Sequence, residues 1–204
     1  MKSSIFFLLV IPVALFSLDF IEADIYVTPE PAGLCKEALI KSNGTQNPEG
    51  SCSSQILGEL PKSSQMVSTI IVKPGNSEVI KVNQNFTIRV EVSNLQTGLF
   101  SDANLDYYDV PQKLTNLGII YGHVHVTIQK LIENRIPDPT EFEFFKGFEG
   151  IADSLGGLET EVPGLPIGYY RLCTMASSEG HQPVVMPVAK RGAQDDCIRF
   201  FVNY

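Results

Sequence analysis

The sequence has no tryptophan, only three histidines among 204 residues, and no cluster of basic residues. Its formal net charge is −8, whereas proteins that bind nucleic acid or an anionic membrane surface usually carry a basic patch. No continuous apolar run of about eighteen residues follows the first 23 positions, so the sequence predicts no membrane span. We therefore expect neither nucleic acid nor a membrane among the partners.

Common catalytic motifs are absent as well. The chain lacks the GxSxG sequence with which many serine hydrolases expose their nucleophile, and it lacks a CxxC pair of the kind found in many zinc sites. Two pairs of carboxylates occur, Glu141 with Glu143 and Asp195 with Asp196. The first pair is typical of an outward strand face and the second of a turn. The sequence therefore predicts a protein that is not an enzyme and needs no cofactor.

The first 23 residues have the pattern of a secretory signal peptide. Lys2 precedes an apolar run over residues 5–16, and Ala23 is a small residue at a suitable cleavage position. The run is too short to span a bilayer. We expect a secreted, extracellular protein.

The four cysteines follow the predicted signal peptide, and oxidation is the default for cysteines of a secreted chain. Four cysteines allow three pairings, and their order along the chain favours the local one, Cys35 with Cys52 and Cys173 with Cys197. A zinc site is the competing interpretation. Cysteines joined in this way leave no free thiol for a cysteine protease.

Two sequons for N-glycosylation are intact, at Asn43 and at Asn85. Gly44, Pro48 and Gly50 predict an exposed loop around Asn43. Asn43 is therefore the better acceptor on physical grounds.

The remaining chain divides into two parts. Residues 24–66 are irregular in pattern and contain the first cysteine pair, whereas residues 67–204 are a succession of short alternating runs separated by turns. The predicted strands are residues 68–72, 78–82, 86–92, 123–129, 141–145, 169–176 and 197–202. Residues 102–117 predict a long loop, and no long amphipathic helix is expected. The predicted fold is all-β, an antiparallel immunoglobulin-like β-sandwich with an irregular, disulfide-stapled N-terminal segment.

Two of the histidines, His123 and His125, lie one residue apart in the predicted strand 123–129. If Val124, Val126 and Ile128 face the core, both histidines lie on the opposite, wetter face. Two such imidazoles can reach one divalent ion, and His181 is the third histidine that could complete a copper or zinc site. The alternative interpretation is that these histidines are polar residues hydrogen-bonded to neighbouring loops.

Several longer motifs carry a resemblance to a group of small secreted fungal proteins. The motifs are YGHVHVTIQ at 121–129, DPT at 138–140, FEFFKG at 142–147, GLPIGYYR at 164–171 and HQPV at 181–184. Within that group, the organisation of the chain is similar to that of the rust transferred proteins. This resemblance implies secretion from haustoria into the surrounding matrix and toward the host cell, a chagasin-like rear domain that inhibits papain-like cysteine proteases, and assembly into filaments.

The inhibitor hypothesis can be followed to individual residues. Chagasin-type inhibitors carry an NPTTG loop after a strand, and here Asn94, Thr97 and Gly98 match it in the segment NLQTG. The proline is missing, and the family's third binding loop has no counterpart in a chain without tryptophan. An ordinary turn between strands is the alternative interpretation.

Self-association is a further hypothesis. Residues 69–72 are β-prone and uncharged, so they could pair with another copy at a sheet edge, although Lys62 and Lys73 flank them. We expect a secreted, non-enzymatic fungal effector or extracellular matrix-type protein that acts at the host interface. Protease inhibition and metal binding by the histidines are the two alternatives.

Overall fold

The computed structural model describes residues 35, 38–45, 49, 52, 57–133 and 135–204. The chain separates into two compact units, Met1–Ala32 and Gly33–Tyr204. The predicted signal peptide, residues 1–23, lies outside the described residues, as does much of the predicted irregular segment 24–66. The described part contains no helix long and apolar enough to cross a membrane.

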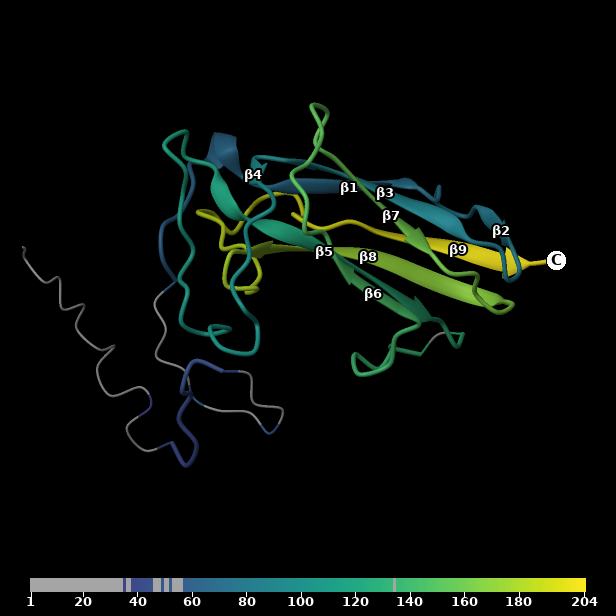
Figure 1. The fold of residues 1–204 in the computed structure, drawn as a ribbon, viewed down its shortest axis with the longest axis horizontal. Coiled ribbons are helices and arrows are strands. Elements are labelled where there is room, and N and C mark those ends of the chain that lie inside the picture. Colours follow the sequence, from purple (N-terminus) through teal and green to yellow (C-terminus); the bar gives the residue numbers. More distant parts are fainter. Residues whose placement is uncertain (1–34, 36–37, 46–48, 50–51, 53–56, 134) are drawn as a thin grey trace, which may run out of the picture. The chain divides into compact units, whose positions relative to one another are not determined.

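The second unit is built from strands (Figure 1). The elements are the 3-10 turn η1 (Ser63–Gln65), β1 (Ser68–Lys73), β2 (Val79–Lys81), β3 (Phe86–Ser93), β4 (Leu95–Gln96), β5 (Ile120–Lys130), β6 (Phe144–Gly147), β7 (Gly157–Val162), β8 (Gly168–Ser178) and β9 (Cys197–Asn203). The loop between β4 and β5 contains no regular element, as predicted.

These strands form two sheets. One has the order β1-β3-β7, and the other has the order β2-β9-β8-β5-β4, with β6 also pairing with β5 (Figure 1). The central pairs of both sheets are antiparallel, and only the short edge strands β2 and β4 pair in parallel. The prediction of an all-β, antiparallel fold is confirmed.

A single apolar core lies between the two sheets. Strand β5 contributes Val124, Val126 and Ile128, which are fully buried, and β8 and β9 contribute Tyr170 and Phe200. The Tyr170 hydroxyl donates a hydrogen bond to the Pro166 carbonyl, which satisfies the one polar group of that side chain. Alternation of apolar and polar residues along each strand is what places one set of side chains in this core.

Three sequence expectations differ from the structure. Strand β6 begins at Phe144 rather than 141, because Gln129 donates hydrogen bonds to the Asp138 and Glu141 carbonyls and holds that segment in a turn. Strand β7, which begins at Gly157 and pairs with β3, is not among the predicted strands. The opposite face of β5 is not uniformly wet, since His123 and Gln129 are both buried under loops.

Two disulfides are present, and they are those of the local pairing. Cys35–Cys52 has a sequence separation of 17, and Cys173–Cys197 has a separation of 24. Cys173 and Cys197 are directly opposite each other on β8 and β9. The second disulfide therefore fixes β9 to the centre of its sheet.

Candidate metal centre

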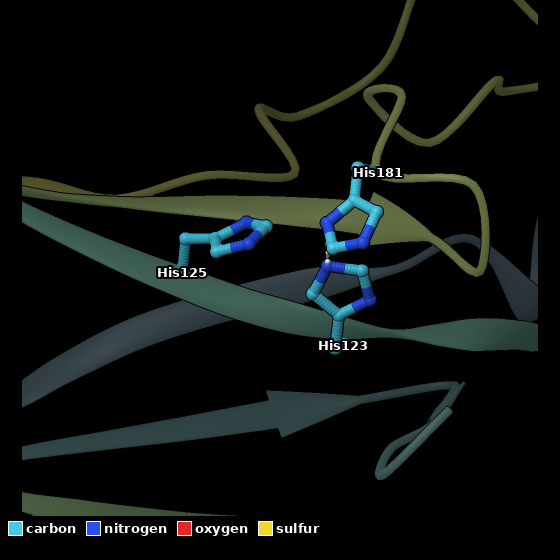
Figure 2. Close-up of side chains that lie close together, drawn as sticks. All are labelled: His123, His125 and His181. Atoms are coloured by element: carbon cyan, nitrogen blue, oxygen red, sulfur yellow. Dashed lines mark hydrogen bonds between the residues drawn. The ribbon is translucent and has the colours of Figure 1, made fainter. Parts of the chain in front are cut away.

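The three histidines of the chain meet on the outer face of the larger sheet. His123 and His125 project from β5, and His181 projects from the turn that follows β8 (Figure 2). One ring nitrogen of each lies within 4.8 Å of a ring nitrogen of the others. We call these three residues the histidine cluster.

A turn with an unusual backbone conformation aims His181 at the cluster. Its backbone N–H donates to the Ser178 carbonyl at 3.0 Å, and its φ angle is 64°. This left-handed conformation is uncommon for residues other than glycine, although histidine adopts it more readily than most. The turn directs the imidazole back toward β5, which lies beside β8 in the sheet.

Backbone carbonyls hold two of the three rings. His123 Nδ1 lies 3.0 Å from the Leu99 carbonyl oxygen, and His181 Nε2 lies 2.7 Å from the Ser101 carbonyl oxygen. A carbonyl can only accept, so each of these ring nitrogens carries the proton. Metal-bound histidines are commonly oriented by the same kind of contact.

The remaining nitrogens of these two rings face each other. His123 Nε2 lies 3.0 Å from His181 Nδ1 (Figure 2). Three close contacts thus link the Leu99 carbonyl, the two imidazole rings and the Ser101 carbonyl. Two neutral imidazoles have only two N–H protons to donate to these three contacts. Both protons are needed at the carbonyls, so two lone pairs point at each other. A cation between them, either a proton or a metal ion, would remove that conflict.

Burial disfavours the extra proton. It lowers the pKa of His123 to about 4, with a further lowering from the charge of His181 and an opposing effect from the Leu99 carbonyl. Burial likewise lowers the pKa of His125 to about 3, and His123 and His181 add to this effect. At neutral pH His123 and His125 are therefore uncharged, which is the form in which an imidazole binds a metal.

Close packing fixes the third ring. His125 stacks on Phe145 of β6 with a centroid distance of 5.2 Å, and its Nδ1 lies 3.4 Å from the Ser177 hydroxyl. Its partner across the β5–β6 pair is Gly147, where a Cβ atom would come within 3.0 Å of the imidazole. Glycine has no Cβ atom, so Gly147 avoids this close contact with the His125 ring.

The cluster lies beside a depression of about 520 Å³. Six of the side chains that line it are Tyr107, His125, Phe145, Met175, His181 and Asp195. Burial raises the pKa of Asp195, although hydrogen bonds from Ala176 and Thr174 act in the opposite direction. A small molecule could reach the histidines from this side.

The interpretation of the histidines as polar residues hydrogen-bonded to neighbouring loops describes His123 and His181, whereas metal binding stays a prediction. The rings are hydrogen-bonded to loop carbonyls, and the same bonds direct their free nitrogens toward one another. Tyr107 and Met175 had no place in the sequence interpretation. Met175 lies opposite His125 in the β5–β8 pair, and this placement depends on the register of the two strands.

The segment compared with chagasin-type inhibitors is not a protruding loop. Thr97 is only 3% exposed, and its hydroxyl accepts a hydrogen bond from the Ala152 backbone at 2.7 Å. Gly98 lies against Gly150 and Ile151, and the Asn94 side chain donates to the Met66 carbonyl. This geometry gives no support to a protease-binding role for these residues.

Strand β1 does lie at a sheet edge, as the self-association hypothesis requires. However, the Thr69 backbone N–H already donates to the Gln194 carbonyl, and that of Ile71 donates to the Asp196 carboxylate. The edge is thus partly covered by the segment before β9. Both predicted glycosylation sites, Asn43 and Asn85, have exposed side chains.

Comparison with known proteins gives a family. A family described as the CLU5d N-terminal domain matches residues 69–203. Pathogenicity cluster 5 protein d of the fungus Colletotrichum graminicola is 48% identical over 167 residues, which are 79% of this chain and 35% of that protein. The chain thus spans about a third of the length of that relative. The expected resemblance to fungal proteins is confirmed for a pathogenicity-associated family, while the narrower likeness to rust transferred proteins stays a prediction.

Solved structures resemble the chain only weakly. A superoxide reductase from Ignicoccus hospitalis has a TM-score of 0.31 and 12% identity, covering 67% of this chain and 80% of that one. A CARDB domain from Pyrococcus furiosus, solved in complex with di-metal ions, has a TM-score of 0.34 and 12% identity, covering 71% and 94%. Values this low do not establish a common fold, and the metal ions of the CARDB domain say nothing about this chain.

Proposed function

The chain belongs to the CLU5d N-terminal domain family, and we propose that it is a secreted, non-enzymatic module that binds one copper or zinc ion at the histidine cluster. The protein would act at the interface between the fungus and its host. The presence of a pathogenicity cluster protein among its relatives supports this setting. Two disulfides suit an extracellular protein.

One observation carries the metal proposal. Two imidazoles that are both anchored to carbonyls by their N–H groups direct unprotonated nitrogens at each other, 3.0 Å apart. A metal ion held by both at about 2.0–2.1 Å in tetrahedral geometry would place them about 3.3 Å apart. These two rings therefore need only a small adjustment to hold an ion, and His125 has a ring nitrogen within 4.8 Å of both.

The donor set indicates which ion fits. Three imidazoles suit zinc and copper, whereas calcium and magnesium prefer oxygen ligands. His123, His125 and His181 would hold the ion, and the depression beside them would leave one side open to water or another ligand. The protein's own contribution is to anchor the rings, through the Leu99 and Ser101 carbonyls, before the ion arrives.

The first test is the metal content of the purified native protein, measured by elemental analysis. We expect about one equivalent of copper or zinc per chain, and its loss in the double variant His123→Ala/His125→Ala. Two finer variants separate metal binding from folding. His123→Asn replaces Nδ1 with an amide nitrogen that can still donate to Leu99, and His181→Gln does the same for Nε2 and Ser101.

These finer variants should fold normally and bind the ion far more weakly. A native protein that contains no metal and does not take up added copper or zinc, as followed by calorimetry, would refute the proposal. So would unchanged affinity in both His123→Asn and His181→Gln. In either case the histidines would be buried polar residues that serve only the fold.

A further inference from the structure

A second group of chemically distinctive side chains lies on the same outer sheet face, away from the histidines. Arg171 of β8 and Arg199 of β9 are directly opposite each other in the antiparallel pair. Together with Arg135, Glu133 and Tyr169 they line a cleft of about 450 Å³, whose other walls are Leu131, Ile136 and Pro137, three apolar residues that follow β5 in the chain. We call this the arginine cleft. Arg171 is four residues from Met175 along β8, which is about 13 Å.

The cleft has a positive charge that the described residues do not neutralise. Their four ion pairs involve Arg89 and Lys146. None of the three cleft arginines forms an ion pair with a described acidic side chain, and Glu133 also has none. Three guanidinium groups and one carboxylate leave an excess of positive charge, in a chain whose net charge is −8.

Neighbouring residues hold the Arg171 guanidinium in place. Its Nη2 donates to the Gln129 side-chain oxygen at 2.5 Å, and the Gln129 amide nitrogen donates to two carbonyls, those of Asp138 and Glu141. Its Nε atom is buried without a hydrogen-bond partner among the described residues. A partly buried cation without a counter-ion is costly, so the site favours an anion from outside the chain.

An aromatic pair lies beside the arginines. Tyr169 and Phe201 are the next outward-facing pair along β8 and β9, and their rings stack with centroids 4.6 Å apart. Phe201 is 43% exposed. The face thus presents two paired arginines and, next to them, a rigid aromatic surface.

We propose that the arginine cleft binds the carboxylate of an acidic sugar, with the guanidinium groups of Arg171 and Arg199 on the carboxylate and Tyr169 against the sugar ring. Arginine forks match the two oxygens of a carboxylate, and directly opposite residues of an antiparallel pair have Cβ atoms about 5 Å apart, so both can reach one anion. An aromatic side chain provides a rigid apolar surface for the ring carbons. The proposal does not depend on metal binding by the histidine cluster.

The test is titration of the full chain with D-glucuronate, followed by calorimetry and by the NMR signals of the ligand. D-glucose has the same ring without the charge, and inorganic phosphate has charge without a ring. Arg199→Ala is the main variant, because the Arg199 side chain has no hydrogen-bond partner among the described residues. Arg191→Ala removes an exposed arginine elsewhere and serves as the matched control.

We expect saturable binding of glucuronate with a Kd near 1 mM, about tenfold weaker binding in Arg199→Ala, and no change in Arg191→Ala. Glucose should not bind, and Tyr169→Leu should weaken the binding of glucuronate. Absence of saturable glucuronate binding, or equal affinity in Arg199→Ala and the native protein, would overturn the proposal. Phosphate binding as tight as that of glucuronate would show a general anion site and would overturn the assignment to a sugar acid.

Discussion

Acidification should destabilise the protein through His123, whose side chain is 2% exposed. Burial lowers its pKa in the native state to about 4, whereas an unfolded chain would show the ordinary value of about 6.5. Between about pH 6.5 and about pH 4, His123 therefore binds a proton in the unfolded chain but not in the native protein. The free energy of unfolding should fall as the pH falls from about 6.5 to about 4, and this contribution should level off below that.

The size of the effect follows from the difference between the two pKa values. At about 1.4 kcal/mol per pKa unit, His123 alone would cost roughly 3 kcal/mol at the acid end of this range, and about 2.5 kcal/mol at pH 4.5. His125 acts in the same direction, because its pKa is lowered to about 3. Carboxylates also titrate in this range, so the His123 contribution must be measured as a difference.

The assay is urea unfolding followed by far-UV circular dichroism at about pH 7 and about pH 4.5, with a chelator to remove metal. The native protein is compared with His123→Asn, which does not titrate and can keep the hydrogen bond to Leu99. The native protein should lose about 2.5 kcal/mol more than the variant between the two pH values. Equal losses in the two proteins would refute the argument, because they would mean that His123 accepts a proton in the native state as easily as in the unfolded chain.

Three other predictions concern stability and association. Replacing Cys173 and Cys197 with serine should lower the free energy of unfolding by about 3 kcal/mol, measured by urea unfolding, since the bond closes a loop of 24 residues. Thr97→Val should cost about 1–2 kcal/mol in the same assay because it removes the buried hydroxyl that accepts a backbone hydrogen bond; no measurable cost would show that this contact is unimportant. Asp196→Ala frees the Ile71 N–H at the edge of β1, so light scattering should detect increased self-association, and scattering equal to that of the native protein would count against edge pairing.

The proposed metal site and the arginine cleft share one sheet face, but different chemistry forms them. The histidine cluster is a set of imidazole nitrogens on one buried and two partly buried side chains, whereas the cleft is an excess of positive charge at the surface. The experiments can therefore separate them. A chelator should affect the first site, while added salt should weaken the second by screening.

The local architecture could be predicted from the amino-acid sequence alone. Strict alternation along 86–92 and 123–129 was sufficient to predict β3 and β5 and to place Val124, Val126 and Ile128 in the core. The local order of the cysteines also favoured the pairing that the structure shows. Such features depend on the two-residue period of a strand and on chain proximity, and both can be read from a single sequence.

The groups of side chains on the outer sheet face depend on contacts between segments that are distant in the sequence. His181 is 58 residues from His123, and their contact depends on the register of β5 with β8 and on the left-handed turn after β8. The pairing of Arg171 with Arg199 and the burial of Thr97 likewise depend on partners distant in sequence. Periodicity shows which face of a strand a side chain occupies, but register and loop packing determine its neighbours. For that reason the sequence identified the three histidines as candidates. The contact between the unprotonated nitrogens of His123 and His181 could be inferred only from the fold.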